Sequence, residues 1–189
     1  MLGQGKVPYD TALNNSWKEL AEVSNADNHT VAFLADTYDV STGKRAVLSR
    51  SKNASPKDFI TILLLHYLIG SSKNKYAPSG EWVSFKDMES GQFYYPAFYE
   101  GAIKPIIKKY GQDPGKLSEA LKKFKGKDIG TGDAGIEISV FPDVPVRIVL
   151  WKGDEEFEAE ATILFDKNIS SIFSTEDIAV LARVMAYSI

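Results

Sequence analysis

The sequence predicts an α+β protein in which a helical layer packs on a small antiparallel sheet. Helical spacing of apolar residues dominates the middle of the chain, and a period of two replaces it from Gly135 onward. The 189 residues are 44% apolar and 25% charged, which is enough for one substantial core. We therefore expect a single domain over residues 1–189.

The N-terminal third predicts one helix and one hairpin. A first helix begins at Asp10 or Thr11 and runs to about Val23, since Leu13, Trp17 and Leu20 recur at helical spacing. The segments VAFLADTYDV and KRAVLS flank the turn-like STGK. This pattern predicts an N-terminal β-hairpin over residues 31–49.

A strongly apolar helix is predicted over residues 56–70. Ser55, Pro56 and Asp58 offer an N-cap, a proline in the first turn and a capping box. The stretch that follows is apolar nearly all round and reaches Gly70, a residue that commonly ends helices. We expect this helix at the centre of the core.

Two shorter helices are predicted between residues 96 and 126. Pro96 can begin a helix that Pro105 kinks or splits before Gly111. Asp113 and Pro114 open an amphipathic helix that Gly126 closes.

The C-terminal part predicts a three-stranded antiparallel meander and a last helix. The segments GIEISVF, PVRIVLW and FEAEATILF alternate or are β-branched, and Pro, Gly and Asp residues separate them. One face of this sheet should be buried and the other wet. Ser174 and Asp177 form a second capping box, which opens a helix to the C-terminus.

Composition excludes several functional classes. The chain has no cysteine, so any iron–sulfur or thiolate zinc site would belong to a partner. The longest apolar run, residues 60–70, is about half the length of a bilayer span, and the first residues do not resemble a signal peptide. We expect a cytoplasmic protein without membrane contact. The net charge of −3 gives no reason to expect nucleic acid.

Charge is unevenly distributed along the chain. Residues 102–127 hold eight lysines, and residues 153–160 hold five acidic residues and no basic one. Two solvated faces are the ordinary explanation. The alternative is that the lysine-rich helices meet an acidic partner.

Few residues suggest catalysis or metal binding. The glycine-rich GTGDAG, residues 130–135, precedes a predicted strand rather than a helix and is typical of a loop. His66 lies among leucines, where a core histidine is commoner than a ligand, and His29 is the other histidine. No familiar catalytic motif is present.

Three carboxylates are weak candidates for a metal site. Asp154, Glu155 and Asp166 offer hard oxygen ligands for Mg²⁺ or Ca²⁺. An acidic hairpin turn is the commoner explanation, and the strands would carry Asp166 to the far end from Asp154.

The segment SGEWVSFKDMESGQFYYPAFYEG, residues 79–101, holds seven of the chain's 22 aromatic residues. This segment, ILLLHYLIGS and FPDVPVRIVLWKGDEEFEAEATILFD together resemble an uncharacterised prokaryotic family, the domain of unknown function numbered 3786. The resemblance runs from about Trp17 to the last helix. It implies a neighbourhood of anaerobic bacteria and archaea, in which some members carry an added iron–sulfur segment. This chain lacks that segment.

The resemblance suggests that residues 79–101 and 141–166 pack together. One interpretation is an ordered aromatic crossing within the core. The other is a cleft lined by Trp82, Tyr94, Tyr95 and Trp151, in which the polar-tipped Tyr94 and Tyr95 stay more exposed than Phe85 or Phe98. By analogy, a corrinoid or another tetrapyrrole is the ligand of most interest. His66 or His29 would then supply the imidazole nitrogen that coordinates its metal.

Three functions remain open from the sequence. The first is a non-catalytic binding or accessory module for anaerobic redox or one-carbon metabolism, with an iron–sulfur or corrinoid protein as partner. The second is a protein-interaction domain with no small-molecule ligand. The third is a small metal-assisted hydrolase.

Overall fold

The computed structural model describes residues 9–189. The chain forms two compact units, each of which is described by itself. Unit 1 holds residues 9–31 and 36–75, and unit 2 holds residues 32–35 and 76–189. The class is α+β, as predicted, and the single domain over residues 1–189 stays a prediction.

Two helices form the helical part of unit 1. Helix α1 (Tyr9–Val23) packs against α2 (Asp58–Lys73). The apolar stretch of α2 is buried as expected, with Leu64 and Leu65 fully inaccessible. The capping box that we predicted at Ser55 is wrong, because Lys57 is the N-cap and no side chain caps the helix. The helix also continues past Gly70, whose carbonyl accepts the N–H of Asn74.

The N-terminal sheet has one strand more than the predicted hairpin. Strands β1 (Asn28–Phe33), β2 (Asp36–Ser41) and β3 (Ala46–Ser49) lie in the order β1-β2-β3. The predicted hairpin corresponds to β2 and β3, which pair from Tyr38↔Ser49 to Ser41↔Ala46. Leu34, at a φ of 53°, turns the chain between β1 and β2 without the glycine that such a conformation favours. That tight turn therefore left no signal in the sequence.

The sheet of unit 2 contains the predicted meander. Strands β6 (Ala134–Phe141), β7 (Val144–Trp151) and β8 (Glu160–Asp166) pair antiparallel in chain order. Two three-residue edge strands, β4 (Trp82–Ser84) and β5 (Gly126–Asp128), complete the order β4-β8-β7-β6-β5. Along β7, Val146, Ile148 and Leu150 are fully buried, while Arg147 between them is not. One face is therefore apolar, as predicted.

The third strand of the meander begins later than predicted. We expected it from Phe157, but β8 starts at Glu160 and Phe157 is 70% exposed. The carboxylate of Asp154 accepts hydrogen bonds from the N–H groups of Glu156 and Phe157, each at 2.8 Å. These bonds hold residues 154–157 in a turn, so their N–H groups are not free for the ladder.

A nearly continuous helical run crosses unit 2. It consists of α3 (Gly91–Phe98), a π-helical turn η2 (Tyr99–Ile103) and α4 (Lys104–Tyr110). The helix begins at Gly91 rather than at Pro96. The kink or split that we predicted at Pro105 takes the form of this π turn, in which the Lys104 N–H donates to the Tyr99 carbonyl. The wider turn accommodates a proline that lacks an N–H.

Three short 3-10 helices lie in the remaining connections of unit 2. They are η1 (Phe85–Asp87), η3 (Pro114–Lys122) in place of the predicted amphipathic helix, and η4 (Lys167–Ser171). The last helix, α5 (Thr175–Ser188), begins at the predicted capping box of Ser174 and Asp177, with both of its hydrogen bonds formed.

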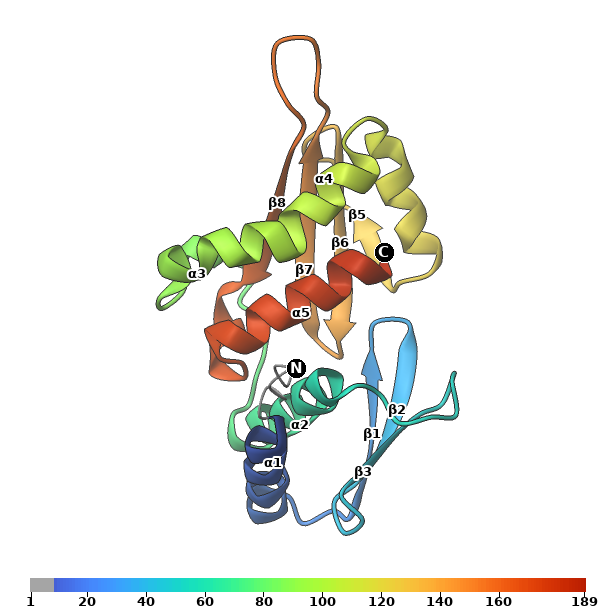
Figure 1. Cartoon of the computed structure of the whole chain (residues 1–189), viewed down its shortest axis with the longest axis vertical. Helices are drawn as coiled ribbons and strands as arrows, with labels where there is room; N and C mark the ends of the chain where they lie inside the picture. The colour runs from blue at the N-terminus through green and yellow to red at the C-terminus, as the bar shows by residue number, and fades with distance from the viewer. Residues whose placement is uncertain (1–8) are drawn as a thin grey trace, which may run out of the picture. The chain divides into compact units, whose positions relative to one another are not determined.

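The core of unit 2 lies between the sheet and its helices. Figure 1 shows α3, α4 and α5 across one face of the five-stranded sheet, with the β7–β8 loop projecting beyond the strands. Ile106 from α4 and Leu181 and Met185 from α5 are buried among the strand residues. This arrangement fixes the helices whose outer surfaces carry the candidate sites.

Candidate functional sites

The two sequence blocks that we expected to pack together do so. Strand β4 pairs with β8, placing Trp82 opposite Asp166 and Val83 opposite Phe165. Phe98 contacts Phe165 edge to face, with ring centroids 6.2 Å apart. The inner side of the aromatic segment is therefore part of the core.

The structure does not bring the four aromatic residues of the predicted cleft together. Trp82 pairs with Asp166 and Trp151 pairs with Glu160, at opposite ends of β8. Six residues of strand correspond to about 20 Å. The Arg147 guanidinium lies 3.9 Å from the centroid of the Trp82 ring, a cation–π contact that occupies one face of that ring.

Tyr94 and Tyr95 are more exposed than Phe85 and Phe98, as predicted. Tyr94 is 53% exposed and Tyr95 is half-buried, whereas Phe85 and Phe98 are buried. The Lys86 ammonium lies 4.0 Å from the centroid of the Tyr95 ring. Tyr95 is thus the less available of the two tyrosines.

Phe93 is the residue that our sequence reasoning missed. It is 81% exposed and contacts Tyr94 edge to face at 5.1 Å. We call Phe93 and Tyr94 the aromatic face; both exposed rings come from α3. The helical spacing of the inward-facing positions 91, 95, 98 and 102 could have revealed it, because position 93 lies on the other side of that stripe.

His66 has a structural role in unit 1. Its Nε2 lies 2.9 Å from the Ser16 hydroxyl, whose hydrogen is donated to the Ala12 carbonyl. The other histidine, His29, lies 3.3 Å from the Ser24 hydroxyl. His66 belongs to unit 1, whereas Trp82, Tyr94, Tyr95 and Trp151 belong to unit 2.

Asp166 is buried and fully hydrogen-bonded. Its carboxylate accepts from the Ser79 hydroxyl at 3.1 Å, the Gly80 N–H at 2.8 Å and the Asn168 N–H at 2.9 Å. Burial alone would raise the pKa of Asp166, but these hydrogen bonds outweigh it and the net shift is downward. This carboxylate links residues 79–80, which lie just before β4, to the end of β8.

The other two candidate metal ligands lie at the far end of the sheet. Asp154 and Glu155 belong to the exposed β7–β8 loop, whereas Asp166 ends β8. Two loop N–H groups lower the pKa of Asp154. Among residues 9–189, no group of three His, Asp or Glu side chains could hold a metal ion.

The β7–β8 loop borders a small acidic hollow. Its volume is about 370 Å³, and it is lined by Asp154, Glu155, Glu156, Phe157 and Glu158 together with Tyr99 and the end of α4. Our prediction of an acidic hairpin turn matches this loop.

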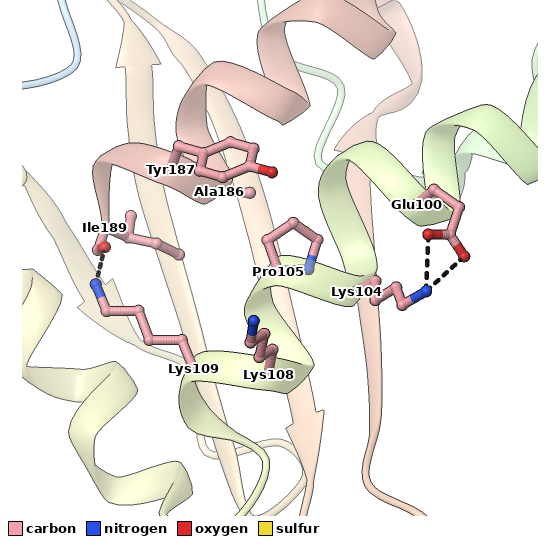
Figure 2. Close-up of a pocket in the computed structure, with 8 residues that line it drawn as sticks. All are labelled: Glu100, Lys104, Pro105, Lys108, Lys109, Ala186, Tyr187 and Ile189. Carbon is pink, nitrogen blue, oxygen red and sulfur yellow. Dashed lines mark hydrogen bonds and ion pairs between the residues drawn. The ribbon is translucent and has the colours of Figure 1, made fainter.

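A larger cleft lies between α4 and α5. It has a volume of about 520 Å³, within the range of ligand pockets. Figure 2 shows Lys104, Pro105, Lys108 and Lys109 along α4; the Lys109 side chain reaches Ile189 at the end of α5, whereas the Lys104 side chain points toward Glu100. The α5 side supplies Ala186, Tyr187 and Ile189.

The three lysines of this cleft differ in their partners. Lys104 lies 2.8 Å from the Glu100 carboxylate, and this hydrogen bond raises its pKa. Lys109 donates to the main-chain oxygen of Ile189. The Lys108 side chain is exposed, and its ammonium has no hydrogen-bond or ion-pair partner among residues 9–189. The run of lysines was visible in the sequence, but the cleft required α5 to lie beside α4.

Fold and surface together define an α+β protein that offers an aromatic face and a basic cleft. The family model described as Domain of unknown function (DUF3786) matches residues 16–188, so the chain belongs to this family. No curated protein and no solved structure matches the chain. Among the helices of residues 9–189, none has the length and apolarity needed to cross a bilayer.

Proposed function

We propose that the protein is a non-catalytic binding or accessory module that docks another protein through its aromatic face. The exposure of Phe93, at 81%, beside the half-exposed Tyr94 is the observation that carries this proposal. Large aromatic side chains on the outside of a domain are favoured where a partner covers them. They also dominate the binding energy of protein interfaces.

The buried contacts on the inner side of α3 favour a preorganised docking surface. Phe98, on the inner side of α3, stacks on Phe85 and contacts Phe165 of the sheet. Phe93 and Tyr94 therefore project from a helix that is fixed to the core. A fixed helix loses little conformational freedom on binding, which increases affinity.

The nature of the partner is proposed from the family resemblance. We propose an iron–sulfur or corrinoid protein of anaerobic redox or one-carbon metabolism, in the cytoplasm. This chain has no cysteine, so an iron–sulfur cluster would be held by the partner. A tetrapyrrole held by this chain alone is less favoured, because Trp82 and Trp151 lie at opposite ends of β8.

Photo-crosslinking in the native host tests the docking surface. Benzoylphenylalanine at position 93 should capture one dominant protein, whereas the same group at the exposed Leu48 of unit 1 should not. The captured protein is then purified and titrated with the wild-type chain and with Phe93→Ala/Tyr94→Ala. We expect the double variant to bind at least about 30-fold more weakly. Equal affinities would refute the proposal.

A further inference from the structure

We propose that the α4–α5 cleft binds a small organic anion that combines a flat apolar part with a carboxylate, sulfonate or phosphate group. This site is separate from the aromatic face, and the inference does not depend on the proposed function. It rests on the size of the cleft, its apolar walls and an unpaired lysine.

The cleft has apolar walls from two helices. Pro105 lies on α4, and Tyr187, Ala186 and Ile189 lie on α5. In Figure 2 the Tyr187 ring lies on the α5 side of the cleft, across from Pro105 on the α4 side. The Tyr187 side chain is 72% exposed, so a flat group placed on it would cover a large aromatic surface.

The cationic character of the cleft centres on Lys108. Its ammonium has no partner among the described residues, and Lys104 lies one turn earlier on the same helix. Residues four apart on a helix are neighbours on its surface, but the Lys104 ammonium pairs with Glu100, so Lys108 is the lysine left to form charge-assisted hydrogen bonds with an anionic group. Such charge-assisted hydrogen bonds are stronger than neutral ones.

The position of Glu100 determines which end of the cleft favours an anionic group. It pairs with Lys104 and, in Figure 2, lies at the opposite end of the cleft from Ile189. The pair is exposed and four residues apart on the helix, so it holds Lys104 only weakly. An anionic group is therefore favoured near Lys108 and Lys109 and disfavoured beside Glu100.

The test uses 8-anilinonaphthalene-1-sulfonate, which joins flat rings to a sulfonate, with the full chain. Lys108→Glu should weaken binding at least tenfold by fluorescence titration, and Tyr187→Ala should weaken it several-fold. Lys116→Glu is the matched control, since Lys116 is an exposed lysine of η3 outside the cleft. Equal effects of Lys108→Glu and Lys116→Glu would overturn the proposal.

Two further measurements separate the cleft from other surfaces. Phe93→Ala should leave probe affinity unchanged, and a loss in this variant would place the probe on the aromatic face and overturn the proposal. Nuclear Overhauser contacts between the probe and the Tyr187 ring should be observed, and their absence would count equally against it. Unchanged melting temperatures would show that the variants fold.

The probe set also examines the chemistry of the ligand. Naphthalene-2-sulfonate should bind, whereas neutral 2-naphthalenemethanol and inorganic phosphate alone should each bind at least tenfold more weakly. An acidic peptide such as residues 153–160 is the other occupant that this charge could attract. Binding of that peptide without binding of either sulfonate would overturn the small-anion proposal in favour of protein docking.

Discussion

Phe85 and Phe98 stack face to face, with ring centroids 4.1 Å apart and ring planes 7° apart. Both side chains are buried, and Phe98 also contacts Phe165 of β8. The stack joins η1 to the end of α3 and so anchors α3 on the core. The aromatic segment thus serves two purposes: its inner rings hold α3 in place, and its outer rings are left at the surface.

The first prediction concerns the helix at the centre of unit 1. Leu64→Ala should lower the free energy of unfolding by about 2–5 kcal/mol, because a fully buried leucine leaves a cavity when truncated. Urea denaturation measures the effect. Leu48→Ala is the control, since Leu48 is exposed in the same unit. A loss below about 1 kcal/mol for Leu64→Ala would mean that the site collapses around the deletion.

The second prediction concerns the start of α3. A Cβ at Gly91 would overlap the carbonyl oxygen of Phe85, which is backbone and cannot turn aside. Gly91→Ala should therefore destabilise the protein by about 1–3 kcal/mol. At Gly43 a Cβ meets no atom within 4 Å, so Gly43→Ala should have a much smaller effect. Similar melting temperatures for the two variants would contradict this account.

The third prediction concerns the pH dependence of stability through Asp166. The folded state lowers the pKa of this carboxyl, so its stabilising contribution is present above about pH 4 and is lost as the pH falls through the folded-state pKa. Asp166→Asn should cost about 1–3 kcal/mol at pH 7, because an amide cannot accept all three hydrogen bonds equally well. The difference from wild type should narrow below pH 4 in urea unfolding. A difference that stayed constant down to pH 3 would show that the charge of Asp166 has no role.

The fourth prediction addresses the metal-assisted alternative. Asp154 and Asp166 lie at opposite ends of the sheet, so millimolar Mg²⁺ or Ca²⁺ should leave the melting temperature unchanged. Differential scanning fluorimetry checks this. A concentration-dependent rise that Asp154→Asn removes would revive the predicted metal site.

The fifth prediction separates the outer aromatic rings from the inner ones. Tyr94→Ala should change stability by less than about 1 kcal/mol, as expected of a half-exposed side chain. Phe98→Ala should cost about 3–5 kcal/mol, because it removes a buried ring from two aromatic contacts. Equal losses in chemical denaturation would show that Tyr94 belongs to the core.

Local signals in the sequence determined much of the fold. The alternation in GIEISVF identified β6, the β-branched run PVRIVLW identified β7, and the capping box of Ser174 and Asp177 located the start of α5. These features depend on residues within one turn or one strand, so the sequence displays them directly. The relative exposure of Tyr94 and Phe98 also followed from side-chain chemistry, since a phenol tolerates water better than a phenyl ring.

Only the tertiary structure decided which surfaces the protein presents. The edge strands β4 and β5 have three residues each and depend on hydrogen bonds to β8 and β6, so they carry no periodic signal of their own. Phe93 became exposed because α3 starts at Gly91 and turns its other side to the sheet. The cleft exists because α5 lies against α4, about 80 residues away in the chain. Sequence by itself could determine the lysines and the aromatic residues, but long-range packing determined which of them meet and which remain open to a partner.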